Sequence, residues 1–291
     1  MMHNNALAVL FALASALTIA WGTVVRHRIA EQSGVAVGDG SGNRAAEVPI
    51  MAAIVQPLWW AGVFSALFGY FLQIVALSFG TLLIVQPVLV LSLMFTLPLS
   101  AKYDGRRISK SETFWAGLLT VAVAVLVILG RPTPGLSVPP LERWLVALSI
   151  GAVVLGALYV YSGRQLRRER ALILGSVTGA IMGYVAVLSK AVVDIFGHSG
   201  FGGLLLSWEL YGLMAGAAIG TAVQQASFNA GALKNSLPAM TIVEPLVAFT
   251  LGYVILGESF QVSGGQWLFM AAALVTMVGS TVILSRKTID D

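Results

Sequence analysis

Long runs of apolar residues, separated by short polar stretches, dominate this chain. A helix needs about 20 apolar residues to cross the hydrocarbon core of a bilayer. Nine runs have about that length: 6–25, 58–79, 82–101, 112–129, 143–163, 171–191, 206–230, 236–256 and 265–285. The pattern predicts an all-α polytopic membrane protein with about nine transmembrane helices.

The stretch 49–79 is too long for one simple span. Pro49 and Pro57 divide it, and the pair Trp59 and Trp60 is typical of the aromatic belt at a membrane interface. We therefore start the second span near residue 58. The alternative is a tenth, short span over residues 45–57.

Composition agrees with a membrane protein. The 291 residues are 57% hydrophobic and 10% charged, whereas a soluble domain is about 25% charged. Cysteine is absent, which excludes disulfides and thiolate metal sites. The net charge of +4 comes from basic residues in short loops, so we expect no nucleic-acid partner.

Basic residues predict the orientation. With nine spans, only Arg131, Arg143 and Lys190 of the 17 Lys and Arg residues fall on one side of the membrane. Lys and Arg favour cytoplasmic loops. The sequence therefore predicts an inner-membrane protein with its N-terminus outside and its C-terminus in the cytoplasm.

The two halves of the chain resemble each other. The string Val-Gln-Pro-Val-Leu at 85–89 resembles Val-Glu-Pro-Leu-Val at 243–247, and Gln73 and Gln225 precede the two strings. The copies lie in spans of opposite direction, so the repeat is inverted. Such repeats, with helices interrupted by proline, are typical of secondary transporters.

This repeat divides the chain into three parts. Residues 1–130 form the first helical repeat, with four spans. Residues 131–170 hold the connecting fifth span and a basic cytoplasmic loop. Residues 171–291 form the second repeat, with four spans.

Glu244 is the leading functional candidate because it lies inside a predicted span. A carboxylate there costs roughly 2.5–3.5 kcal/mol on insertion scales and normally faces protein or a water-filled cavity. It could bind a proton, a cation or a cationic substrate. Alternatively, it is a hydrogen-bonded residue that braces the helix kink at Pro245, the counterpart of Pro87.

Uncharged polar residues supply further candidates. Gln73, Gln86, Gln225 and Asn229 lie in spans and could bind a polar substrate, or could join helices by hydrogen bonds. Trp21 ends the first span and is either an interface residue or part of a pocket.

Lys190 lies at the outer end of the sixth span, four residues before Asp194. Residues four apart share one helix face, so an ion pair between them is expected. The alternative is an anion-binding or gating charge at the outer mouth.

Two glycine stripes indicate close helix packing. Glycines recur every four residues at 175, 179 and 183, and again at 212, 216 and 220. Small residues at this spacing let helix backbones approach closely. A sliding surface between moving helices is the alternative.

Several chemistries are not expected. His3, His27 and His198 are scattered, so no metal site is predicted. The sequence has no phosphate-binding loop with a lysine, no nucleophile elbow and no paired-histidine protease motif. We expect neither an enzyme nor a cofactor.

Glu244-Pro245-Leu246-Val247-Ala248, followed by Gly257-Glu258, resembles the EamA-type repeat of the drug/metabolite transporter superfamily. The Trp21-Gly22 end of the first span fits that superfamily. Within it, Pro-Leu-Trp-Trp-Ala-Gly at 57–62 resembles the NIPA-like magnesium transporters, which also have nine spans.

One position departs from the magnesium transporters. Where they carry a Gly-Glu-x-Ala-Asn pattern, this chain reads Gly-Tyr-Phe-Leu-Gln at 69–73, with Tyr70 in place of the acid. Magnesium is usually held by carboxylates and water. The departure therefore favours another substrate.

The sequence predicts a secondary-active transporter of a small organic metabolite or drug, working by alternating access with proton or ion coupling or exchange. The alternatives are a magnesium transporter, a flippase of a lipid-linked sugar and a non-transporting membrane assembly protein. The expected partners are the small-molecule substrate and membrane lipids, and a homodimer is left open.

Overall fold

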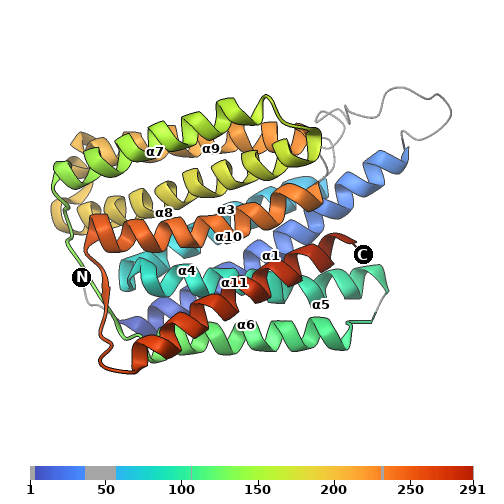
Figure 1. Cartoon of the computed structure of the whole chain (residues 1–291), viewed down its shortest axis with the longest axis horizontal. Coiled ribbons are helices and arrows are strands. Elements are labelled where there is room, and N and C mark those ends of the chain that lie inside the picture. The colour runs from blue at the N-terminus through green and yellow to red at the C-terminus, as the bar shows by residue number, and fades with distance from the viewer. Residues whose placement is uncertain (1–3, 37–56, 106, 231–232, 291) are drawn as a thin grey trace.

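A computed structural model of the chain describes residues 4–36, 57–105, 107–230 and 233–290. Long helices run along one common direction and are joined at the two ends of the bundle (Figure 1). They are α1 (Asn5–Ala36), α3 (Pro57–Phe79), α4 (Leu82–Val90), α5 (Ser92–Asp104), α6 (Lys110–Ile128), α7 (Leu141–Ser162), α8 (Arg167–Leu206), α9 (Trp208–Ala230), α10 (Leu233–Leu251) and α11 (Gln266–Asp290). A π-helix, η1 (Gly252–Leu256), extends α10, and the short strands β1 (Pro132–Thr133) and β2 (Ser259–Phe260) pair antiparallel.

Eight helical segments of this described part are long and apolar enough to cross a bilayer: Asn5–Val25, Trp60–Phe79, Leu82–Lys102, Lys110–Ile128, Leu141–Ser162, Arg167–Leu206, Pro238–Leu256 and Gln266–Ser285. The chain is therefore an all-α, multi-pass membrane protein, as predicted.

The seventh predicted span, 206–230, corresponds to α9. This helix has 23 residues but lies outside the set of eight, because Glu209, Gln225 and other polar residues lower its hydropathy. A ninth crossing stays a prediction. The alternative span over 45–57 lies outside the described residues, except for Pro57, where α3 begins.

Two predicted spans differ in shape from the structure. The run 82–101 forms two helices, α4 and α5, which meet at Leu91. The run 171–191 is too short, because α8 continues to Leu206. Hydropathy falls at Lys190 and Asp194, but these charges pair on one face and the helix continues. At Gly200, φ of 64° and ψ of −167° interrupt α8 in a conformation that suits glycine.

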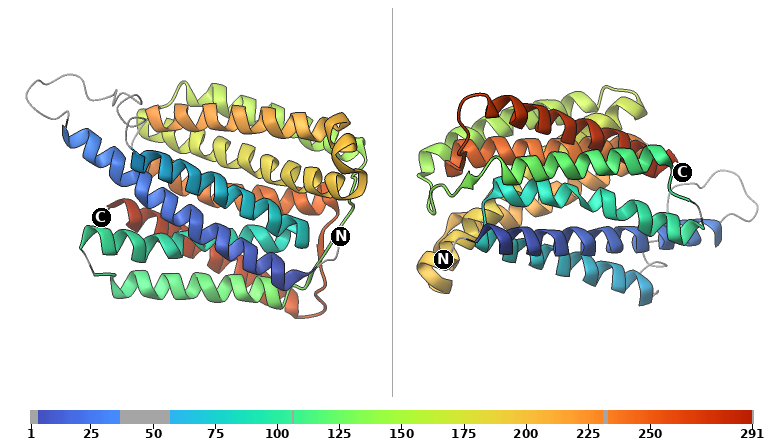
Figure 2. Two further views of the ribbon diagram at one scale, coloured as in Figure 1. Left: turned by 180° about the vertical axis from the view of Figure 1, so that it is seen from behind. Right: turned by 90° about the horizontal axis from the view of Figure 1, so that it is seen from below.

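The glycine stripe of α8 packs directly on α10. A Cβ atom at Gly179 would lie 2.7 Å from the Met240 carbonyl oxygen, and one at Gly183 would lie 2.8 Å from Val247 Cβ. The predicted close packing is therefore confirmed for this stripe. Figure 2 shows from two sides how α8 runs along the neighbouring helices α9 and α10.

The short helix α4 occupies the centre of the bundle. Every residue from Leu82 to Val88 is buried. The surrounding core also draws on α1, α6, α8, α10 and α11. The start of α4 is therefore enclosed by protein, so its backbone groups need partners within the protein.

The two ends of the bundle differ in charge. The α5–α6 and α7–α8 connections lie at the same end as the last turn of α11, whereas α1 begins at the other end (Figure 1). We call the first one the basic end, because these connections and the helix ends beside them carry Lys102, Arg107, Lys110, Arg164, Arg167, Arg168 and Arg170. The other is called the opposite end.

Candidate functional site

A polar cavity lies at the opposite end of the bundle. It has a volume of about 310 Å³ and is bordered by the end of α3, by α8, by the β1–α7 loop and by the segment after η1. Its titratable lining residues are Lys190, Asp194, His198 and Glu258. The cavity therefore brings side chains of both charge signs together.

Lys190 of α8 is nearly buried, at 7% exposed. Its ammonium group donates hydrogen bonds to Asp194 Oδ1 at 2.9 Å and to the Leu77 carbonyl oxygen at 2.8 Å. The predicted ion pair is confirmed. Leu77 lies in the last turn of α3, where carbonyl groups lack partners within the helix and a positive charge is favourable. Lys190 therefore caps α3 across the bundle.

Glu258 performs the matching role at the start of α4. Its carboxylate is 1% exposed and accepts hydrogen bonds from the backbone N–H groups of Leu82 at 2.9 Å and Leu83 at 3.0 Å. The N-cap residue Thr81 makes no side-chain cap, so Glu258 satisfies N–H groups that the helix leaves unpaired. A negative charge is also favourable at a helix N-terminus.

The turn before Glu258 sets its direction. The span Pro238–Leu256 ends at Gly257, whose φ of 71° is left-handed and suits glycine. The Leu136 N–H donates to the Leu256 carbonyl oxygen, which holds the β1–α7 loop against the same turn. Glu258 is thus carried back towards the bundle instead of into solvent.

Burial raises the pKa of the Glu258 carboxyl from its ordinary value of 4.5 to about 7. The hydrogen bonds from Leu82 and Leu83 and the positive charge of Lys190 oppose the rise, and the negative charge of Asp194 adds to it. The carboxyl therefore exchanges a proton near neutral pH.

The predicted residue Glu244 lies elsewhere, inside α10. Its side chain is half-buried and is followed by the buried Pro245. Within the described part of the chain, its carboxyl makes no hydrogen bond or ion pair, and it does not line the polar cavity. A role for Glu244 in binding a proton or a ligand stays a prediction.

Gln86 occupies the corresponding position in α4, before Pro87. It is 2% exposed, and its Nε2 atom has no hydrogen-bond partner among the described residues. Helices α4 and α10 are in contact. An unpaired buried amide is costly, about 1–3 kcal/mol, so this nitrogen marks a place where a polar partner would be favourable.

The remaining predicted residues do not join these groups at the polar cavity. Gln73 on α3 and Trp21 on α1 are half-buried, and Gln225 on α9 is exposed. Asn229 belongs to α9, but its side chain lies outside what the structure describes. Among the predicted site residues, Lys190 is the one that lines the polar cavity.

Sequence reasoning missed Glu258 as a site residue. In the sequence it follows an apolar run and a glycine, a pattern that indicates an exposed loop. The signal that could have found it is a glycine followed directly by an acid at the end of a span. Gly257 allows the chain to reverse, and the reversal places Glu258 against the bundle.

The apolar helices and the charged cavity between them define a multi-pass helical membrane protein. No family model matches the chain, and no solved structure matches it. It is 59% identical over 287 residues to the uncharacterized protein Cgl0250/cg0304 of Corynebacterium glutamicum, which covers 99% of this chain and 97% of the relative. The chain belongs to the same family as that corynebacterial protein.

Proposed function

We propose that this protein is a secondary-active transporter that moves a small organic metabolite or drug by alternating access, coupled to protons or another ion. The proposal is carried by two contacts around the polar cavity. Lys190 binds the Leu77 carbonyl, and Glu258 binds the Leu82 N–H. Both contacts join the second half of the chain to the first, so they hold the bundle closed at the opposite end.

Helix pairing supports two inverted repeats around α7. In the first half, α1 packs on α3 and on the α4–α5 pair, and in the second half α8 packs on α9 and α10. The contacts of α6 with α11 and of α4 with α10 join helices at equivalent positions. Rocking of one repeat against the other is the usual route to alternating access in such proteins.

Glu244 and Gln86 are the proposed coupling and recognition groups. Each precedes a proline inside a helix, and the two helices are in contact. Proline removes a backbone hydrogen bond and leaves a carbonyl free, which membrane proteins tolerate where the backbone is buried in protein or lines a cavity. Solute and proton would therefore meet between these helices.

We place the basic end in the cytoplasm and the polar cavity outside, in agreement with the preference of Lys and Arg for cytoplasmic loops. The N-terminus would then be outside, and the membrane would be the inner membrane. The resemblance to the drug/metabolite transporter superfamily supports this arrangement and the solute class.

The absence of cysteine in the chain allows a direct test of water access. Single variants Glu244→Cys and Gln86→Cys are treated with a charged, membrane-impermeant methanethiosulfonate in intact cells and in inverted vesicles. The controls are Leu119→Cys, which is buried in the core, and Val121→Cys, which is 60% exposed on the outer face of α6.

If the protein is a transporter, Glu244→Cys and Gln86→Cys should react with the methanethiosulfonate, and both controls should not. Lys190→Met should increase the reaction from outside, because it removes one contact that closes that end. In inverted vesicles, Glu244→Gln should abolish solute uptake driven by a pH gradient. Cysteines as unreactive as Leu119→Cys from both sides would instead favour a non-transporting membrane protein.

A further inference from the structure

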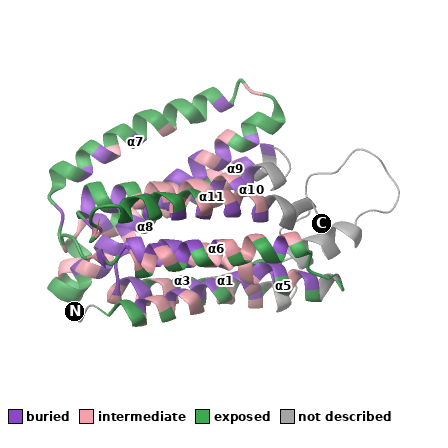
Figure 3. Cartoon of the chain, turned by 60° about the horizontal axis from the view of Figure 1, so that its bottom comes forward, coloured by how far each residue is buried: buried purple, intermediate pink, exposed green. Residues whose placement is uncertain are grey.

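Helix α7 stands apart from the rest of the bundle. Among its 22 residues, only Trp144, Ala147, Gly151 and Ser162 are buried, and Figure 3 shows it as a largely exposed helix set off from its neighbours. Near the opposite end it is attached by Trp144, which packs edge-on against Trp208 of α9, and by the Tyr184 hydroxyl, which donates to the Ala147 carbonyl at 2.7 Å.

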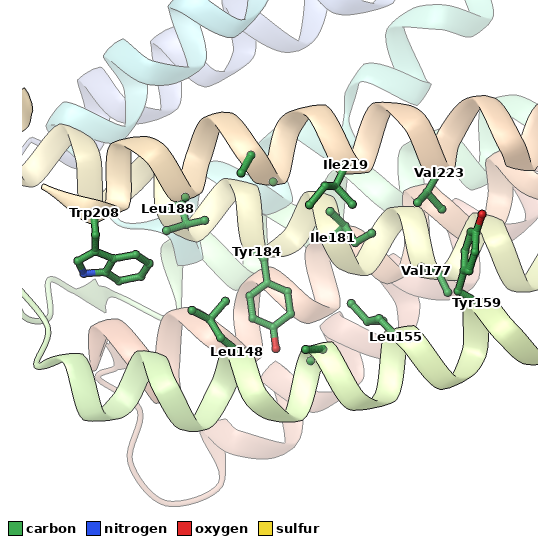
Figure 4. A pocket seen from close by; sticks show the side chains of 16 residues that line it. Leu148, Leu155, Tyr159, Val177, Ile181, Tyr184, Leu188, Trp208, Ile219 and Val223 are labelled. Atoms are coloured by element: carbon green, nitrogen blue, oxygen red, sulfur yellow. The ribbon is translucent and has the colours of Figure 1, made fainter.

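From these attachments towards the basic end, α7, α8 and α9 line an apolar groove of about 550 Å³, and Tyr184 and Trp208 belong to its lining. Figure 4 shows Leu155 of α7 on the side of the groove opposite Ile181 of α8, with Ile219 and Val223 on α9 above them in the view. One turn of a helix fills roughly 400–600 Å³ for a diameter of about 10–12 Å. The groove therefore has about the volume of one helical turn, far less than a spanning helix occupies, and we assign it to the slimmer acyl chain of a lipid.

A cluster of arginines lies where this groove reaches the basic end. The lining residue Tyr159 comes five residues before Arg164. Arg164, Arg167, Arg168 and Arg170 are all exposed on the α7–α8 connection and its first helical turn, with Glu169 as the single acid among them. Guanidinium groups bind phosphate oxygens in a bidentate manner and strengthen attachment to anionic lipids.

We propose that the groove and these arginines form a binding site for one anionic phospholipid of the bilayer. One acyl chain lies in the groove between α7, α8 and α9, and the headgroup phosphate is held by the arginines at the basic end. The apolar groove selects a lipid chain, and the charge of the cluster selects an anionic headgroup. The site does not depend on the proposed transport activity.

Two glycines provide matched variants to test the groove. A Cβ atom at Gly156 on α7 or at Gly117 on α6 would meet no other atom within 4 Å. Gly156→Leu fills the groove, whereas Gly117→Leu adds the same side chain to an exposed helix face away from it. Ala152→Leu is a second groove-filling variant if Gly156→Leu fails to fold.

The arginines are tested by changing Arg164, Arg167, Arg168 and Arg170 together to Gln. The control removes the charge of Arg107 and Lys110, which lie at the same end but do not line this groove. Purified protein in detergent is titrated with palmitoyl-oleoyl phosphatidylglycerol or phosphatidylcholine. Native mass spectrometry counts bound lipid, and thermal unfolding measures stabilisation.

The unchanged protein should bind one phosphatidylglycerol about tenfold more tightly than phosphatidylcholine. Gly156→Leu should lose the binding of both lipids. The arginine variant should bind phosphatidylglycerol no more tightly than phosphatidylcholine, and both controls should behave like the unchanged protein. Equal phosphatidylglycerol binding by Gly156→Leu and Gly117→Leu would overturn the proposal. A dimer that Gly156→Leu dissociates without any loss of lipid would overturn it too, since a second copy would then fill the groove.

Discussion

Glu258 and Leu82 are separated by 176 positions in the chain, yet the Glu258 Oε1 atom accepts a hydrogen bond from the Leu82 N–H at 2.9 Å. The acid that follows one apolar span thus caps the first turn of another, buried span. Two unpaired N–H groups at the start of α4 and one carboxylate displaced from water satisfy each other. This contact makes the stability of α4 depend on the second half of the chain.

Replacing the carboxylate should therefore destabilise the bundle. Glu258→Ala leaves the N–H groups of Leu82 and Leu83 buried without an acceptor, at a cost of about 1–3 kcal/mol for an unsatisfied buried group. Glu258→Gln should cost less, because its amide oxygen still accepts one bond. Thermal unfolding in detergent measures the loss. Glu142→Ala, at an exposed acid in the first turn of α7, serves as the control and should change little.

The same carboxyl should make stability depend on pH. Because its pKa is raised from 4.5 to about 7 in the folded protein, the folded state binds the proton more tightly than the unfolded state. The stabilisation is complete below pH 4.5 and is lost as the pH rises through 7. We compare the unfolding midpoint of the unchanged protein with that of Glu258→Gln. The difference between the two should fall from pH 4.5 to 7 and then stay level. A difference that rises over this range would contradict the expectation.

Lys190→Met tests the second contact between the halves. The variant removes the donor to the Leu77 carbonyl and the ammonium group that pairs with Asp194. We expect a loss of about 1–3 kcal/mol in thermal unfolding. Adding Asp194→Asn should recover part of it, because the negative charge that Lys190 paired with is removed too. Lys110→Met, at an exposed lysine, is the matched control. Equal midpoints for Lys190→Met and this control would show that the contact contributes little.

Hydropathy predicted the spans because the bilayer requires long apolar segments whatever their neighbours are. It could not place the break at Leu91 or the interruption at Gly200, because both lie inside or beside apolar sequence and depend on tertiary packing. It also could not show that α7 separates from the bundle, since its apolar residues look the same facing lipid or protein.

The site divides in the same way. The Lys190–Asp194 pair was predictable because residues four apart share a helix face. The contacts of Glu258 with Leu82 and of Lys190 with Leu77 were not, because they join segments distant in the chain. Glu244 could be predicted as a candidate because it is an acid inside a span. Glu258 could not, because its place in the site depends on the turn at Gly257.

The contact between α8 and α10 gives a prediction about packing. Gly179→Ala would place a Cβ atom 2.7 Å from the Met240 carbonyl oxygen and 3.1 Å from Met240 Cα. Backbone atoms cannot move aside as a flexible side chain can, so the helices must separate, at a cost of about 1–3 kcal/mol. Gly117→Ala meets open space and should gain up to about 1 kcal/mol, because alanine favours the helix. Thermal unfolding of both variants measures the contrast. If Gly179→Ala were as stable as Gly117→Ala, the two helices would not be held in close backbone contact.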